Sequence, residues 1–283
     1  MVMKKIDWNT KSISANIKEK LESGNLRAAG YVYPTGFDKL DNELNGGISS
    51  GLYCIGALPG LGKSTFIMQV AENLSANGIP VVVFSLEMDM DHLSIKALDR
   101  QLYLSTKKHE HIGDETLVER VSMLSRNIYV IPYESSVDAM NEYIDDYVTN
   151  FEKAPVVIVD YLQMMKGLPN MTDKQVVDSN VLALKAMSAR YNTSVIMISA
   201  LNRDHYTDVT LKSFKDSGSI EYVADVILGM KYKNDKYDGE YKNIILSILK
   251  QTYGRSNGQI ELIFRPEHSY FEEKNDEKKR VVY

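Results

Sequence analysis

The sequence contains very little cysteine, with Cys54 as the single example among 283 residues. One thiol cannot form an internal disulfide, which excludes a disulfide-stabilised secreted fold and fits a reducing compartment. No apolar run is long enough to span a bilayer, and the opening MVMKKIDWNTKS lacks the apolar core of a signal peptide. We therefore expect a cytoplasmic protein with no membrane partner, in which Cys54 packs inside an apolar run.

The chain also lacks a positive net charge. Its formal net charge of -5 provides no global field that would attract nucleic acid. Contact with DNA would have to come from a local patch, or from a ring that brings small patches together. Apolar residues make up 44% and charged residues 25% of the chain, as in a folded globular protein. The length allows one large α/β domain or two small ones.

Apolar runs alternate with amphipathic segments from residue 51 onward. Runs such as VVVF and VVIV are apolar on both faces, which is typical of parallel strands covered by helices. After residue 220 the helical pattern fades and further strands are predicted, as an antiparallel extension. The fold class predicted is α/β, with a mostly parallel twisted sheet flanked by helices and antiparallel C-terminal strands. The predicted strands are 51–57, 80–87, 127–133, 154–160, 194–200, 222–232, 242–251 and 258–265, and the predicted helices are 64–78, 90–102, 138–151 and 176–191.

Three segments are expected: an N-terminal arm at 1–33, a domain at 34–270 and a charged tail at 271–283. In the arm, one helical stripe carries the apolar residues Ile13, Ile17 and Leu21. A stripe this thin cannot form a core by itself. It needs a surface to lie on, either the body of this chain or a neighbouring subunit.

The string GALPGLGKST, residues 56–65, lies between a predicted strand and a predicted helix. Glycines in such a turn let backbone N–H groups converge on a phosphate at the positive end of the helix. The usual pattern is missed at one position, where Ala57 replaces the first glycine, but an alanine needs only a compatible turn there. In this pattern Lys63 reaches the terminal phosphates of ATP and the Ser64 hydroxyl holds Mg²⁺. The predicted nucleotide-binding residues are Pro59, Gly60, Leu61, Gly62, Lys63, Ser64 and Thr65.

Such a site also needs carboxylates. Asp160 ends the apolar strand PVVIVD, where it can serve the metal, and the next residue is Tyr161 rather than a second acid. Glu87, at the end of VVVFSLE, is the candidate to activate the water, because neighbouring parallel strands end at the same edge of a sheet. The alternative role for Glu87 is a helix cap before MDMDHL. A complete site requires an acid, which favours the catalytic role.

Several longer strings carry a family resemblance. PTGFDKLDNELNGGISSG, VVVFSLEM, VVIVDYLQMM, LNR and FKDSGSIEYVADVIL occur in the order seen in DnaB-type replicative helicases, and the chain resembles that family over residues 33–265. The resemblance implies a RecA-like ATPase with bound ATP and Mg²⁺, usually in a ring of six that moves along single-stranded DNA. It implies that Glu87 is the catalytic acid and that Asp160 serves the metal. It also implies that Lys250 touches the nucleotide of the neighbouring subunit, and that the stripe at 13–21 is a linker helix docked on that neighbour.

The chain departs from this family at three points. Ala200 stands where the family has a glutamine that senses the γ-phosphate, and Thr252 stands where it has an arginine finger. Arg255 lies three residues further on and is a candidate substitute. The helical domain through which such helicases meet primase has no counterpart in this sequence, so we expect a motor that is slow, depends on a partner or does a different job. Primase or a loader is the candidate partner. These departures keep a second hypothesis open: an ATP-binding switch or replication assembly factor that does not unwind DNA.

The DNA-facing loops of such a fold are expected after Asp160 and after residues 194–200. The candidate DNA-binding residues are Lys166, Arg203, Lys212 and Lys215, with Lys174 nearby. The alternative is that these are ordinary surface cations.

Overall fold

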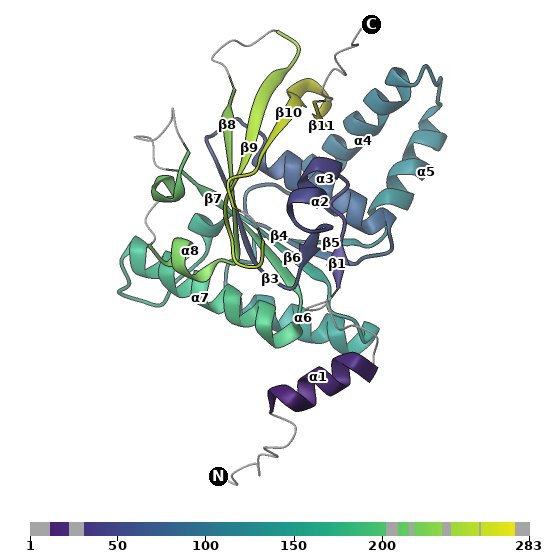
Figure 1. Ribbon diagram of the computed structural model, residues 1–283. Coiled ribbons are helices and arrows are strands. Elements are labelled where there is room, and N and C mark those ends of the chain that lie inside the picture. The colour runs from purple at the N-terminus through teal and green to yellow at the C-terminus, as the bar shows by residue number, and fades with distance from the viewer. Residues whose placement is uncertain are drawn as a thin grey trace, which may run out of the picture.

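The computed structural model describes residues 12–22, 31–201, 209–214, 218–233, 239–254 and 256–274. Its centre is a nine-stranded sheet with the strand order β11-β10-β9-β8-β3-β7-β6-β4-β5 (Figure 1). The six strands from β8 to β5 in this order pair in parallel, and β8, β9, β10 and β11 pair antiparallel. The predicted α/β class, a mostly parallel sheet with an antiparallel extension, is confirmed. The nine strands are β3 (Gly51–Ala57), β4 (Val81–Ser85), β5 (Ile128–Pro132), β6 (Val156–Asp160), β7 (Ser194–Ala200), β8 (Val226–Tyr232), β9 (Lys242–Gln251), β10 (Gln259–Arg265) and β11 (Tyr270–Glu273).

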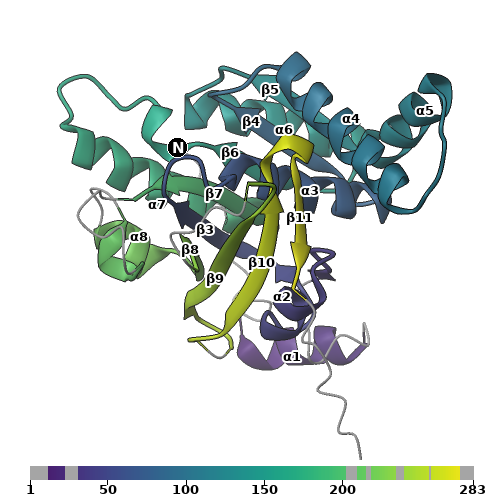
Figure 2. The ribbon, with the colours of Figure 1, turned by 90° about the horizontal axis from the view of Figure 1, so that it is seen from above.

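Helices cover both faces of the sheet because its central strands are apolar on both sides. Figures 1 and 2 show α3 against one face and α6 and α7 along the other, while α4 and α5 form a hairpin that projects beside β5. A small two-stranded sheet of β1 and β2 precedes β3. The remaining elements are α1 (Ile13–Glu22), β1 (Val32–Tyr33), α2 (Asp38–Glu43), β2 (Ile48–Ser49), α3 (Lys63–Ala76), α4 (Met90–Lys107), α5 (Asp114–Ser125), α6 (Val137–Phe151), η2 (Leu162–Met164), α7 (Asp173–Tyr191), η4 (Leu211–Ser213), α8 (Gly218–Val223) and η5 (Pro266–His268).

The region around residues 218–232 differs from the sequence expectation. Residues 222 and 223 belong to α8 rather than to a strand, and β8 pairs in parallel with β3 on one side and antiparallel with β9 on the other. Asp225, between α8 and β8, explains this arrangement. Its carboxylate accepts hydrogen bonds from the Leu52 amide (2.7 Å) and from the Lys185 ammonium (2.5 Å), and its own amide donates to the Leu52 carbonyl (2.8 Å). These bonds align the start of β8 with β3.

Two further elements were absent from the sequence expectation. The segment 114–125, which carried no structural prediction, forms α5 and packs against α3 and α4. Residues 271–273, predicted as the start of a charged tail, form most of β11, which pairs with β10 from Leu262 to Arg265. The sheet therefore continues to Glu273, beyond the predicted boundary at 270. The division into an arm, a domain and a tail stays a prediction in other respects.

The apolar stripe of α1 is exposed in the part of the chain that the structure describes. Ile13, Ile17 and Leu21 have exposed fractions of 81%, 52% and 59%. Cys54, in contrast, is fully buried in β3, and burial raises the pKa of its thiol. The thiol therefore has the packing role expected from its apolar run. Among the described residues, no helix is long and apolar enough to cross a membrane.

Candidate functional site

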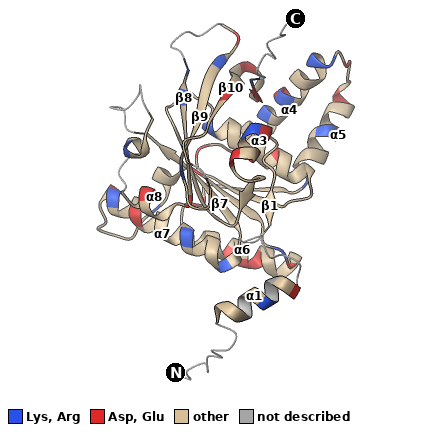
Figure 3. Cartoon of the chain, viewed as in Figure 1, with Lys and Arg blue, Asp and Glu red and all other residues tan. Residues whose placement is uncertain are grey.

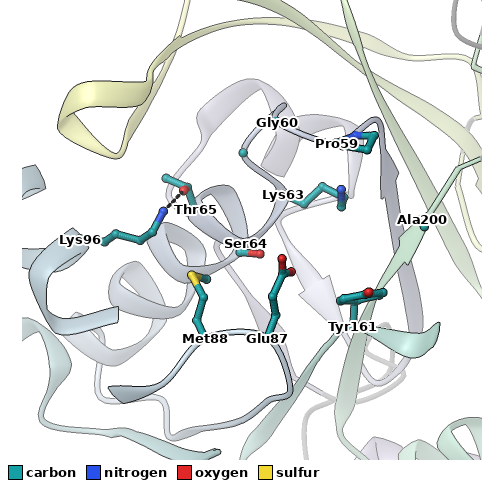
Figure 4. A pocket seen from close by; sticks show the side chains of 11 residues that line it. Pro59, Gly60, Lys63, Ser64, Thr65, Glu87, Met88, Lys96, Tyr161 and Ala200 are labelled. Carbon is teal, nitrogen blue, oxygen red and sulfur yellow. Dashed lines mark hydrogen bonds between the residues drawn. The ribbon is translucent and has the colours of Figure 1, made fainter. Parts of the chain in front are cut away.

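The turn between β3 and α3 opens onto a cavity of about 370 Å³, within the size range of small-molecule sites (Figure 4). Gly60 and Gly62 both have positive φ, at 77° and 83°, a region that glycine enters without strain. Gly62 is required for a second reason. A Cβ at this position would lie 2.7 Å from the Phe264 ring, so a side chain would collide with the C-terminal strands. The cavity is lined by Pro59, Gly60, Gly62, Lys63, Ser64, Thr65, Glu87, Met88, Lys96, Tyr161 and Ala200.

Six of the seven predicted nucleotide-binding residues line this cavity, and Leu61 is the exception. Its side chain is fully buried in the core, and its amide donates to the Leu58 carbonyl (3.4 Å). Ala57 resolves the question raised by the missing glycine. It is the last residue of β3 and its φ is not positive, so the backbone there needs no glycine.

Lys63, the first residue of α3, points along the phosphate turn. Its ammonium donates to the carbonyls of Ala57 (3.2 Å) and Leu58 (3.4 Å). Burial lowers the pKa of this ammonium, and the carboxylates of Asp160 and Glu87 oppose that shift. The cation is thus held at the turn by weak contacts that a phosphate oxygen can replace.

The two predicted acids meet at the same end of the sheet. β4 pairs with β6 so that Ser85 lies opposite Asp160, and Glu87 follows β4 by two residues. β3 is not next to β4, since β7 and β6 lie between them. The acids nevertheless lie on neighbouring strands, and Figure 4 shows the Glu87 carboxylate pointing across the cavity toward Ser64 and Lys63.

The structure separates the two roles considered for Glu87. The N-cap of α4 is Asp89, whose carboxylate accepts a hydrogen bond from the His92 amide (2.9 Å). Glu87 lines the cavity instead. The capping role therefore belongs to a different acid, which supports the catalytic role for Glu87.

Asp160 is a buried carboxylate with a 4% exposed fraction. Burial raises its pKa from 3.8 to about 6; the hydrogen bond from Ser64 lowers it, the Glu87 charge raises it, and Lys63 and Lys96 lower it. Because the folded protein holds this proton more tightly than the unfolded chain, ionised Asp160 destabilises the fold above pH 6. The cost disappears below about pH 4, where both states are protonated.

Replacing Asp160 with asparagine is therefore expected to stabilise the nucleotide-free protein while it impairs the site. A shift of about two pKa units corresponds to about 3 kcal/mol at pH 8, and the gain should shrink as pH falls from about 6 to about 4. Urea unfolding of both proteins at several pH values would measure it. A variant that is less stable than the native protein at high pH would contradict the assignment.

Ser64 and Asp160 are suited to Mg²⁺, which prefers oxygen ligands and is held by one or two carboxylates together with substrate phosphates. They share a hydrogen bond at the mouth of the phosphate turn, and a cation would compensate the buried charge of Asp160. The described residues contain no group of three or more His, Cys, Asp or Glu able to hold a metal by themselves. Phosphate oxygens would have to complete the coordination.

The residues at and near the family's sensor and finger positions lie as follows. Ala200 lines the cavity, and its amide donates to the Gln163 side chain (3.1 Å). Lys250 is outside the lining, where its ammonium donates to the carbonyls of Glu221 (2.8 Å), Tyr222 (3.2 Å) and Ala224 (2.7 Å). Thr252 donates its hydroxyl to the Asp225 carbonyl (3.0 Å). Arg255 lies outside the described residues.

Of the predicted DNA contacts, Arg203 and Lys215 also lie outside the described residues. Lys166 is exposed in the loop after η2, and Lys212 is exposed in η4. Figures 1 and 2 place both elements on the side of α7 and α8, away from the α4–α5 hairpin. Figure 3 shows Lys and Arg interspersed with Asp and Glu along the ribbon.

Sequence reasoning missed two notable residues of the cavity wall, Lys96 and Tyr161. Lys96 reaches the cavity from α4 and donates to the Thr65 hydroxyl (3.4 Å). In the sequence, Lys96 is simply a lysine nine residues after Glu87. Its position at the cavity follows only from the way α4 packs. Tyr161 follows Asp160 directly, and the sequence indicated only that this position does not hold a second acid.

Comparison with known proteins agrees with this geometry. Residues 33–273 match the family model described as DnaB-like helicase C terminal domain. The replicative DNA helicase DnaB of Pasteurella multocida is 29% identical over 261 residues, covering 84% of this chain and 54% of the relative. The corresponding helicase of Mycoplasma genitalium is 29% identical over 284 residues, covering 89% and 58%. The chain thus spans a little over half the length of these curated relatives.

Two solved structures share the fold. One, described as the ATPase domain of its protein, superposes with a TM-score of 0.77 at 23% identity, covering 95% of this chain and all of that one. A DnaB-like replicative helicase, described together with its interactions with primase, superposes with a TM-score of 0.78 at 21% identity, covering 94% and 69%. These likenesses confirm the RecA-like arrangement expected from the sequence resemblance.

Proposed function

The chain belongs to the DnaB-like helicase C-terminal domain family, and from this premise we propose that it is an ATP-hydrolysing helicase motor that moves along single-stranded DNA. The observation that carries the proposal is that Lys63, Ser64 and Glu87 line one cavity at the phosphate turn. Asp160 lies outside the lining but accepts a hydrogen bond from Ser64. A cation, a hydroxyl and two acids are the groups that phosphoryl transfer needs.

The residues divide the chemistry between them. Glu87 takes a proton from the water as the water oxygen attacks the γ-phosphorus and the bond to ADP breaks. Lys63 and the amides of the phosphate turn balance the charge of the phosphate oxygens. Ser64 and Asp160 would hold Mg²⁺, which would supply positive charge to offset the charge of the phosphates.

Assembly into a ring of identical subunits is the second part of the proposal. The Lys250 ammonium does not line its own chain's cavity but donates to three backbone carbonyls, and in a ring it would exchange these contacts for a neighbour's phosphate. The stripe of Ile13, Ile17 and Leu21 is exposed, and packing on a neighbouring subunit would bury it. In a ring, Lys166 and Lys212 would be repeated in each subunit, and weak phosphate contacts would add up. Primase or a loader stays a predicted partner.

The test is a titration of ATP turnover with single-stranded DNA, with particle mass measured on the same sample. We expect turnover to rise severalfold with DNA and to weaken with added salt, because phosphate contacts release counterions. We also expect a mass of about six chains in the presence of ATP, as the family resemblance implies.

The outcome would separate the motor from the alternative switch. The absence of ATP turnover with and without DNA would contradict the motor. An ATP-dependent ring that neither responds to DNA nor separates strands would favour the switch or assembly factor. The family membership favours the motor.

A further inference from the structure

Lys96 is the second lysine in the wall of the cavity, and none of the roles described above uses it. It lies on α4 and is partly buried, and its ammonium is 3.4 Å from the Thr65 hydroxyl in the first turn of α3. Figure 4 shows Lys96 and Lys63 on opposite sides of Ser64 and Glu87. The cavity is thus bounded by a cation on each side.

The rest of α4 fixes this position. Arg100, one turn further on the same helical face, has a 1% exposed fraction. Its guanidinium pairs with Glu72 of α3 and donates to the Ser269 carbonyl (2.8 Å). Tyr103 stacks on His268 with ring centroids 4.3 Å apart. A buried ion pair between α3 and α4 holds the two helices that carry Thr65 and Lys96, so Lys96 is not free to leave the cavity edge with its helix.

The balance of charges around the cavity also indicates a role for Lys96 in binding phosphate. Glu87 and Asp160 bring two negative charges to a site meant for a triphosphate, and Lys63 offsets one of them. The family positions expected to add a sensor and a finger are Ala200 and Thr252, which carry no charge. Lys250 is bound to carbonyls elsewhere in its own chain. Lys96 is the remaining lysine of the cavity lining.

We propose that Lys96 contacts the terminal phosphate of bound ATP from the same subunit and stabilises the charge that develops as this phosphate is transferred. The proposal rests on the proposed function, because it assigns a catalytic role within the same site. The ammonium needs only to exchange its weak contact with the Thr65 hydroxyl for a phosphate oxygen. A cation so placed acts on ATP and not on ADP, which lacks the γ-phosphate.

The test compares Lys96→Met, which keeps the length of the side chain without its charge, with Lys96→Arg and with the control Lys108→Met. Lys108 is an exposed cation at the C-cap of the same helix. Affinities for ADP and for a non-hydrolysable ATP analogue are measured together with turnover, and melting curves check that each variant folds.

We expect Lys96→Met to lower turnover about 10²-fold and to weaken the ATP analogue about tenfold, with ADP affinity within about twofold of native. Lys96→Arg should restore most of the turnover, and Lys108→Met should match the native protein. Unchanged turnover in Lys96→Met, or equal weakening of ADP and analogue, would overturn this proposal while leaving the motor intact. A native protein that binds no ATP would overturn both.

Discussion

Glu87→Gln is expected to lower ATP turnover about 10³-fold while ATP binding stays near the native level. General-base catalysis contributes about 10²–10⁴-fold, and glutamine keeps the shape of the side chain but cannot take the proton from water. Phosphate binding should persist, since Lys63 and the glycines of the turn are unchanged. Removing the Glu87 charge should also lower the pKa of Asp160, because that charge raises it.

Single-turnover hydrolysis and equilibrium binding of labelled ATP would separate the two effects. Asp91→Asn provides the control, since Asp91 is an exposed acid in the first turn of α4 and does not line the cavity. Turnover within a few-fold of native in Glu87→Gln would show that another group activates the water.

Lys63→Ala is expected to abolish measurable hydrolysis through loss of nucleotide binding. Glu87→Gln, in contrast, should keep ATP binding and lose only turnover. Removing a preorganised charge partner from such a site lowers the rate about 10²–10³-fold, and here ground-state affinity should fall as well. The variant also removes the cation near Glu87 and Asp160. The two uncompensated carboxylates then repel an incoming triphosphate.

Binding of ATP and ADP by calorimetry would show the loss, which should affect both nucleotides because Lys63 lies at the turn rather than at the far end of the cavity. Lys153→Ala is a suitable control at an exposed position. Native affinity for ATP in Lys63→Ala would mean that the turn is not the phosphate site.

The phosphate turn could be predicted from the sequence because its cause is local. Gly60 and Gly62 supply the positive φ that the turn requires, and Lys63 and Ser64 follow in the next helix whatever the rest of the chain does. The strands from β3 to β7 were also predictable, since a short apolar run bounded by turns favours a strand whether it lies at the centre of the sheet or at its edge.

Other features depended on contacts between distant segments. The sequence expectation extended a strand through residues 222–225, and only the bonds from Asp225 to Leu52 and Lys185 explain why the strand begins at Val226. The strand order puts β4 beside β6 and so brings Glu87 to Asp160. Asp89 caps α4, so the alternative role of Glu87 as a helix cap is not needed.

The sequence by itself determined the α/β class, the phosphate turn and the family, because backbone conformation and burial follow from residue types at short range. Only the tertiary structure decided that Lys96 reaches the cavity, that Lys250 does not, and that Leu61 turns into the core. The physical reason is that a side chain's partners depend on how helices pack on the sheet. That packing is fixed by pairs such as Arg100 and Glu72, which lie 28 residues apart.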